Sequence, residues 1–273
     1  MLVRDGGTTG LRRQYRARRS QTAGSTEWHS LAVISVVMPA HNEAAYLETA
    51  VREVHEGLRA RGLDFELFVV ENGSTDDTPE IARRLASRYP NVRVSSRPVA
   101  NYGAALREGL IGSRGEFVVT FDVDYYELRF IDLALALLEV GDEAPVIVVA
   151  SKRASGSRDD RPWPRRFVTA IFGWMLRIGF SLSVSETHGM KMMRRAPVEI
   201  LLCRCRFASD LFDTELVIRA ERAGLRVAEL PARTQERRPS RTSIWRRVPR
   251  TLVGLVELRI TLWREAHCRP RRK

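Results

Sequence analysis

The chain has 273 residues, a formal net charge of +12 and a sequence pI near 10.5. This length accommodates one large α/β domain, or at most two smaller ones, with a substantial core. Cys203, Cys205 and Cys268 have neither a zinc-site spacing nor an even number, which argues against a structural zinc site and a disulfide framework and favours a reducing, cytoplasmic location.

The positive charge is concentrated at the two ends. Residues 1–20 carry six Arg and one Asp, and residues 233–273 carry thirteen Lys or Arg and three Glu. Such ends attract lipid head groups or nucleic acid, although a solvated Arg-rich surface explains them as well. No zinc-finger spacing or aromatic-basic RNA motif occurs, so we expect no nucleic-acid partner. Residues 1–30 lack the apolar core of a secretory signal and are expected to form a flexible basic arm.

Strands and helices alternate along the first half of the chain. Apolar and β-branched runs predict strands at residues 32–38, 65–70, 91–95 and 117–121. Helical apolar spacing predicts helices at residues 44–60, 78–88, 103–111 and 130–138. This series predicts an α/β fold, with a Rossmann-like, mostly parallel sheet flanked by helices.

The second half is less regular. It has a predicted strand at 145–150, helices at 166–179, 197–202 and 210–223, and a last strand at 225–230. The apolar run 167–184 contains Arg177, which at the centre of a bilayer costs roughly 2.5–3.5 kcal/mol. We therefore expect this run not to span a membrane, and a core helix and a membrane-surface helix both remain open.

A final helix is predicted at 244–263, where leucines recur on one side among several arginines. The pattern is that of a basic amphipathic helix, which either packs on the domain or contacts a membrane. Pro249 would kink this helix or mark its true start.

Two carboxylates, Asp122 and Asp124, directly follow the predicted strand 117–121. A buried parallel strand places both at its carboxyl edge, where open α/β sheets bind their ligands. Carboxylates suit hard cations, so the pair predicts a site for Mg²⁺ or Mn²⁺. A solvated turn after a strand is the alternative explanation.

Three segments together carry a family resemblance: Val-Val-Met-Pro-Ala-His-Asn-Glu at 36–43, Val-Val-Glu-Asn-Gly-Ser-Thr-Asp-Asp-Thr at 69–78 and Phe-Asp-Val-Asp at 121–124. In this order and spacing they resemble the family 2 glycosyltransferases of GT-A fold. Within that family the chain is most similar to the dolichyl- or polyprenyl-phosphate sugar synthases, over a stretch from about Ala32 to Ser243.

The resemblance implies three regions. A basic arm at 1–30 precedes a GT-A domain at 31–243, and a basic amphipathic helix and tail follow at 244–273. Within the domain, 31–127 would be the nucleotide-sugar half and 128–243 the acceptor half.

The donor site implied by the resemblance lies in the loops after the strands. Its expected residues are Pro39, Ala40, Glu43, Glu71, Asn72, Asn101, Gly103, Asp122, Val123 and Asp124, with the metal on Asp122 and Asp124. Glu71 and Asn72 stand where the family usually has two aspartates, which leaves the nucleobase open. Without the resemblance, residues 71–78 are equally typical of a polar turn that ends in a helix cap.

The resemblance also implies an acceptor site in the second half. The expected acceptor-phosphate ligands are Arg153, Arg165, Thr169 and Lys191, since guanidinium forks suit a phosphate monoester. The expected catalytic residues are Asp124, Glu186 and Glu215. Surface charge is the alternative for the arginines, and helix-dipole stabilisation is the alternative for Glu215.

The resemblance implies an inverting, metal-dependent transfer of a hexose from a UDP- or GDP-sugar to a polyprenyl phosphate, and with the basic ends it predicts a peripheral protein on the inner face of the membrane. An acceptor phosphate is ionised near neutral pH and needs orientation more than a base, whereas an alcohol would need Glu186, His188, Asp213 or Glu215 as base. Tyr126 and Ile244 depart from the residues usual in lipid-phosphate members. The alternatives are a soluble acceptor and a non-catalytic nucleotide-sugar-binding relative.

Overall fold

The computed structural model describes residues 33–139, 141, 144–154, 158–159, 163–209, 211–234 and 244–267. The predicted N-terminal arm, residues 1–30, lies outside these ranges. So do residues 268–273 of the predicted C-terminal tail.

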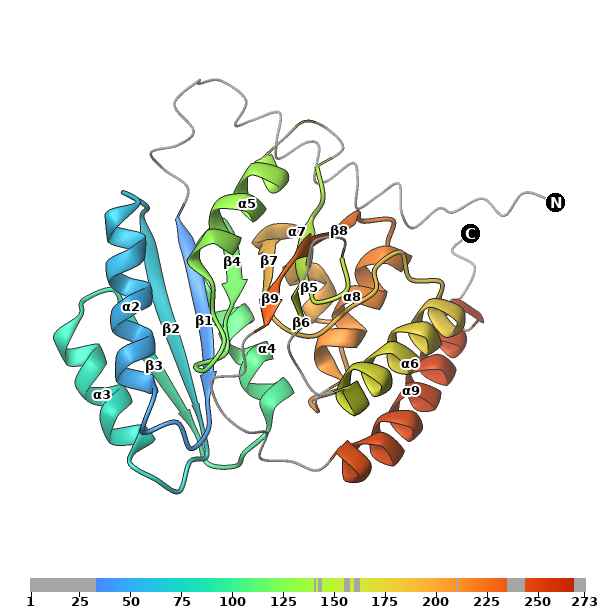
Figure 1. Cartoon of the computed structure of the whole chain (residues 1–273), viewed down its shortest axis with the longest axis horizontal. Coiled ribbons are helices and arrows are strands. Elements are labelled where there is room, and N and C mark those ends of the chain that lie inside the picture. Colours follow the sequence, from blue (N-terminus) through green and yellow to red (C-terminus); the bar gives the residue numbers. More distant parts are fainter. Residues whose placement is uncertain are drawn as a thin grey trace, which may run out of the picture.

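A seven-stranded sheet forms the centre of the domain, in the order β3-β2-β1-β4-β7-β5-β8 (Figure 1). Its strands are β1 (Ile34–Ala40), β2 (Phe65–Asn72), β3 (Val92–Arg97), β4 (Phe117–Thr120), β5 (Ile147–Ser151), β7 (Lys191–Arg194) and β8 (Val227–Pro231). Neighbouring strands are parallel except at β7, which is antiparallel to both β4 and β5. Two short strands, β6 (Arg158–Asp159) and β9 (Arg233–Thr234), pair separately.

Helices cover both faces of the sheet (Figure 1). They are α2 (Leu47–Ala60), α3 (Thr78–Arg88), α4 (Tyr102–Gly112), α5 (Leu128–Glu139), α6 (Trp163–Phe180), α7 (Arg195–Leu202), α8 (Phe212–Arg222) and α9 (Ile244–His267). Side chains alternate along a strand, so Val36 and Val37 of β1 point to opposite faces. Val36 belongs to the core under α2, α3 and α5, and Val37 to the core under α4, α7 and α8.

The predicted α/β fold with a mostly parallel sheet is confirmed, and α3 has the predicted bounds. Three details differ. The strand β7 was not predicted, and β9 follows β8, so the strand at 225–230 is not the last. The final helix begins at Ile244, upstream of Pro249, and continues to His267, so the proline does not mark its start. No helix in the part of the chain that the structure describes is long and apolar enough to cross a membrane.

Candidate active site

The loops that follow β1 and β2 are joined by hydrogen bonds at the carboxyl edge of the sheet. The Asn42 side chain, on a residue with φ of +55°, accepts a bond of 2.8 Å from the Thr75 amide. The Glu43 amide donates to the Thr78 hydroxyl at 2.7 Å. These bonds hold the two sequence motifs at 36–43 and 69–78 side by side, as expected for neighbouring parallel strands.

Glu71 and Asn72 end β2, and each is 4% exposed. Oε1 of Glu71 accepts the Ser74 amide at 2.7 Å. The Asn72 carbonyl accepts a bond of 2.9 Å from Nδ1 of His41, and its side-chain oxygen accepts the Asn101 amide at 2.8 Å. Asn72 therefore connects the loop after β1 to the start of α4.

The start of α4 is fixed by a cap and a close contact. The Asn101 side chain accepts the Ala104 amide at 3.1 Å, which is an N-cap bond. A Cβ at Gly103 would lie 2.2 Å from the Ser209 carbonyl oxygen, so only glycine fits. Between them, the Tyr102 hydroxyl donates to Oδ1 of Asp122 at 3.2 Å. Asn101 and Gly103 thus position a tyrosine on the first aspartate, a contact that the sequence did not predict.

The aspartate pair lies on a tight turn after β4. Asp122 and Tyr125 exchange two backbone hydrogen bonds, of 3.1 and 3.2 Å, with Val123 and Asp124 at the tip. Val123 is 3% exposed, which anchors the turn in the core. Asp122 and Asp124 are therefore held in a fixed, partly buried turn rather than in a loose solvated one.

A charged cluster surrounds Asp122. Lys191 and Asp213 are each 1% exposed, and Nζ of Lys191 lies 3.0 Å from Oδ1 of Asp213. Burial, followed by the charges of Asp124 and Asp213, raises the pKa of Asp122 to about 6. Burial opposes ionisation of Asp213 as well, but Lys191 and His188 outweigh it and lower the pKa of that carboxyl. His188 Nδ1 is 3.8 Å from Oδ2 of Asp213.

Lys191, a predicted acceptor-phosphate ligand, lies in this buried cluster. Its ammonium donates to the Gly189 carbonyl at 2.8 Å and pairs with Asp213, and almost none of the side chain is exposed. It therefore balances the buried charge of Asp213, and its contact with an acceptor phosphate stays a prediction.

Glu215, a predicted catalytic residue, has all its described partners in the protein itself, and its catalytic role stays a prediction. Glu215 is fully buried, and its Oε2 accepts the Arg206 and Phe207 amides at 2.9 and 2.8 Å. Oε1 accepts Nε of Arg219 at 2.8 Å. The acid that α8 contributes to the cluster is Asp213, whereas Glu215 holds the preceding loop against the helix.

The predicted acceptor residues lie around the end of β5. Glu186 is buried and accepts the Lys152 amide at 2.8 Å, with the Lys152 ammonium 3.6 Å away. The exposed Arg153 follows, and its Nη1 donates to the Thr169 carbonyl on α6 at 3.4 Å. The structure thus brings Arg153 and Thr169 together, while the side chain of Arg165 lies outside the described part of the chain.

The two aspartates fit a divalent cation that a substrate completes. Among the described residues, no group of three or more His, Cys, Asp or Glu could hold a metal unaided. Mg²⁺ is commonly bound by one or two carboxylates together with substrate phosphates and water. Burial, and after it the charges of Asp124 and Asp213, raise the pKa of Asp122, and a bound cation would offset both effects. The donor set at Asp122 and Asp124 therefore suits Mg²⁺ or Mn²⁺ bound with a diphosphate.

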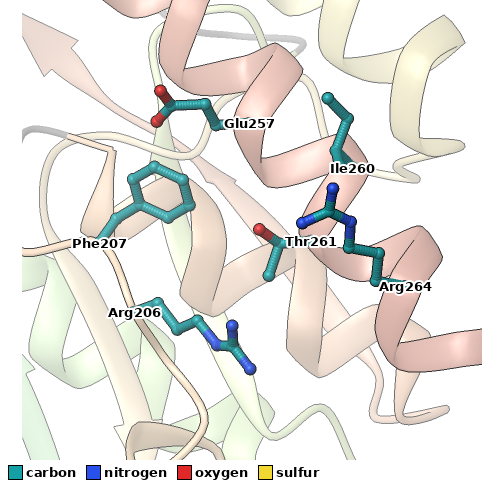
Figure 2. Close-up of a pocket in the computed structure, with 6 residues that line it drawn as sticks. All are labelled: Arg206, Phe207, Glu257, Ile260, Thr261 and Arg264. Atoms are coloured by element: carbon teal, nitrogen blue, oxygen red, sulfur yellow. The ribbon is translucent and has the colours of Figure 1, made fainter. Parts of the chain in front are cut away.

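A separate pocket of about 370 Å³ lies between α9 and the loop before α8 (Figure 2). It is lined by Arg206, Phe207, Glu257, Ile260, Thr261 and Arg264. None of the predicted site residues lines it, so it does not belong to the Asp122 cluster.

The comparisons with known proteins identify the family of the chain. The model of glycosyl transferase family 2 matches residues 35–201, which include the paired aspartates and the Asp122 partners Tyr102 and Lys191. The chain belongs to glycosyl transferase family 2. Glycosyltransferase AglD of Haloferax volcanii is 30% identical over 250 residues, covering 87% of this chain and 38% of that protein. Dolichyl-phosphate beta-glucosyltransferase ALG5A of Trichomonas vaginalis is 26% identical over 216 residues, covering 74% of this chain and 66% of that protein.

A solved structure of another protein has the same fold. The glucosyl-3-phosphoglycerate synthase from Mycobacterium tuberculosis, in complex with Mn²⁺ and UDP-glucose, superposes with a TM-score of 0.63 at 23% identity. The match covers 94% of this chain and 84% of that one. The predicted family and the predicted GT-A fold are both confirmed.

Proposed function

We propose that this protein transfers a hexose from a UDP- or GDP-sugar to a polyprenyl phosphate at the inner face of the membrane, with inversion at the anomeric carbon. The similarity to dolichyl-phosphate beta-glucosyltransferases supports a lipid-phosphate acceptor. The Mn²⁺ and UDP-glucose complex of a protein with the same fold supports a metal-bound nucleotide sugar.

The main support for an ionised acceptor is that the buried acids near the site are already engaged in ion pairs and hydrogen bonds. Asp213 is paired with Lys191, and its lowered pKa makes it a weak general base. Glu186 is engaged by Lys152, and Glu215 by Arg219 and two amides. These predicted catalytic acids therefore suit structural roles better than proton abstraction. An acceptor that is already ionised, such as a phosphate monoester, needs no such base.

The donor half of the site would work by positioning. Asp122 and Asp124 would hold the divalent cation, which when bound offsets negative charge on the departing diphosphate. The Tyr102 hydroxyl holds Asp122, the charge of Lys191 lowers the pKa of Asp122, and the bonded loops after β1 and β2 would bind the nucleoside. Side-chain and backbone groups of Ala40, Glu43 and Glu71 lie at that edge.

The acceptor half would orient the phosphate. A phosphate oxygen forms the new bond to the anomeric carbon as the bond from that carbon to the diphosphate oxygen breaks, so a single displacement inverts the centre. Arg153 is exposed at the carboxyl end of β5 and lies against α6, where its guanidinium can bind the acceptor phosphate.

A soluble acceptor is the second candidate, because an exposed arginine at this position would bind any small molecule that carries phosphate or carboxylate. The experiment that separates the two measures nucleotide release from a panel of UDP- and GDP-sugars with Mn²⁺ or Mg²⁺. Each reaction is run with polyprenyl phosphate in detergent, with phosphoglycerate, and without acceptor. Stimulation by the lipid alone supports the proposal. Stimulation by phosphoglycerate alone favours the soluble acceptor, and donor binding without release in every reaction refutes both.

A further inference from the structure

Two neighbouring helices expose apolar side chains along one line each. Four apolar side chains on α6 are between 41% and 64% exposed, and four on α9 are between 44% and 60% exposed. At 3.6 residues per turn, positions three or four apart lie on one side of a helix. We call these two stripes together the apolar face, formed by Phe167, Ile171, Trp174, Ile178, Val253, Val256, Ile260 and Trp263.

The opposite side of each helix is apolar as well and packs in the core. Leu176 of α6 is 2% exposed and Leu258 of α9 is fully buried. A helix that is apolar on both sides is typical of one covered on both sides. The fold covers one side of α6 and of α9 and leaves the apolar face to solvent in the monomer.

The orientation of the apolar face is fixed by polar contacts beneath it. Glu265 on α9 receives two bonds from the guanidinium of Arg219 on α8, at 2.8 and 3.2 Å. Arg219 is itself bound to the buried Glu215. On α6, Gly173 lies so close to the Ser185 carbonyl that a Cβ would be 2.8 Å from its oxygen. The two stripes therefore cannot turn inward without breaking these contacts.

The apolar face lies next to the expected acceptor site. Helices α6 and α9 lie side by side, and both begin at the edge of the sheet where the parallel strands end (Figure 1). The bond from Arg153 to the Thr169 carbonyl joins the end of β5 to the first half of α6. A surface that docks on the apolar face would thus also reach the edge of the sheet that carries Arg153.

The charges beside the two stripes indicate which kind of surface covers the apolar face. Arg166 and Arg177 on α6, and Arg259 and Arg264 on α9, are exposed. Among the described side chains of these two helices, Glu257 is the only exposed acid, since Glu265 is half-buried. A symmetric pair of copies joined through this face would bring the same arginines together. A bilayer with anionic lipids instead offers an apolar interior bordered by negative charge, and tryptophans favour that boundary.

We propose that the apolar face docks this protein on the surface of a bilayer containing anionic lipids. The stripes of α6 and α9 enter the boundary between head groups and acyl chains, and the flanking arginines bind the lipid phosphates. The proposal rests on the membrane location in the proposed function and names the surface that makes the contact, while the choice of acceptor does not enter the docking.

Co-sedimentation of the full chain with large vesicles tests the proposal. The vesicles contain phosphatidylcholine, alone or with phosphatidylglycerol. We expect the wild-type chain to bind, and to bind more tightly with phosphatidylglycerol. The variant Trp174→Ser, Ile178→Ser, Val256→Ser, Trp263→Ser should bind about tenfold more weakly or worse, because it removes exposed apolar area from both stripes. The matched control is Val99→Ser, Ile111→Ser, which removes side chains of similar exposure elsewhere and should bind like the wild type.

Three results would overturn the proposal. The first is recovery of the wild type free of vesicles of either composition. The second is a stripe variant that binds as well as the wild type, in which case the basic ends carry the attraction. The third is a wild-type dimer in sedimentation velocity that the stripe variant separates, so that a second copy covers the face. Equal midpoints of thermal unfolding show that the stripe variant is folded. Lipid-stimulated nucleotide release in detergent, where no bilayer exists, tests the acceptor separately.

Discussion

The ammonium of Lys191 lies 3.0 Å from Oδ1 of Asp213, and each side chain is only 1% exposed. The pair joins β7, the antiparallel strand in the middle of the sheet, to the first turn of α8. Its lysine also lowers the pKa of Asp122, against the larger effects of burial and of the neighbouring acids. The ionised form of Asp122, which would hold the metal, is thus stabilised by a lysine on β7.

We expect Lys191→Met to destabilise the fold by about 3–5 kcal/mol, since it leaves Asp213 buried without its cation. Urea unfolding followed by circular dichroism measures the change. The double variant Lys191→Met, Asp213→Leu removes both charges and should recover much of that loss. An unfolding free energy of Lys191→Met equal to that of the wild type would show that the pair is solvated and would remove its structural role.

Two glycines should respond oppositely to alanine. Gly103→Ala places a Cβ against the backbone carbonyls of Ala208 and Ser209, so we expect a loss of about 1–3 kcal/mol. A Cβ at Gly179, in the last turn of α6, would meet no atom within 4 Å. Gly179→Ala should therefore be neutral or raise stability by up to about 1 kcal/mol. Thermal and urea unfolding of both variants check the contrast, which fails if the two free energies shift alike.

Glu66 should make stability depend on pH. Burial opposes its ionisation, but bonds from Ser35 and Arg93 and from the Arg114 amide lower its pKa below the ordinary 4.5. Because the folded pKa is the lower one, ionised Glu66 stabilises the fold above pH 4.5, and this contribution is lost as pH falls through the folded pKa.

Glu66→Gln should therefore cost about 1–3 kcal/mol at pH 7. Urea unfolding of the wild type and of Glu66→Gln, measured at several pH values between 7 and the acid transition, gives the difference at each. We expect the difference to shrink as the wild-type carboxylate becomes protonated. A difference that stays constant throughout would mean that Glu66 has the same pKa in the folded and unfolded chain.

Arg153 should affect the acceptor more than the donor. If its guanidinium binds the acceptor phosphate, Arg153→Ala should raise the KM for the acceptor about tenfold or more while the affinity for the nucleotide sugar changes little. Initial rates at varied acceptor concentration and calorimetric titration with the donor measure the two quantities. Arg129→Ala, at an exposed position on α5, is the matched control. An unchanged KM for the acceptor in Arg153→Ala would remove this residue from the site.

The parts of the fold that could be predicted are those fixed by local pattern. The strands β1 and β2 are buried along their whole lengths and are mostly apolar in sequence. Helix α3 has a proline in its first turn and ends before Pro90. The strand β7 could not be recognised, because it is four residues long and begins with a lysine. Its antiparallel direction depends on pairing with β4 and β5, which local periodicity does not report.

The candidate site, like the fold, could be predicted only where a local sequence pattern determines the structure. The turn at Asp122 and Asp124 follows directly from a strand and its sequence motif. The burial of Lys191 depends on Asp213, which lies in a different element, so the sequence motif alone could not predict this ion pair. Likewise, Asp213 and Glu215 are two residues apart on α8, and only tertiary packing decides which of them contacts the cluster.

The most direct test of the account is the effect of Asp124→Asn on metal-dependent nucleotide release from the preferred donor, with acceptor present. The matched control is Asp132→Asn, an exposed aspartate on α5 that pairs with Arg61. We predict a loss on the order of a hundredfold or more for Asp124→Asn, with unfolding unchanged, because a group that supports the leaving diphosphate is removed. Asp132→Asn should keep wild-type release. Wild-type release by Asp124→Asn would contradict the assignment of this turn as the metal-diphosphate site.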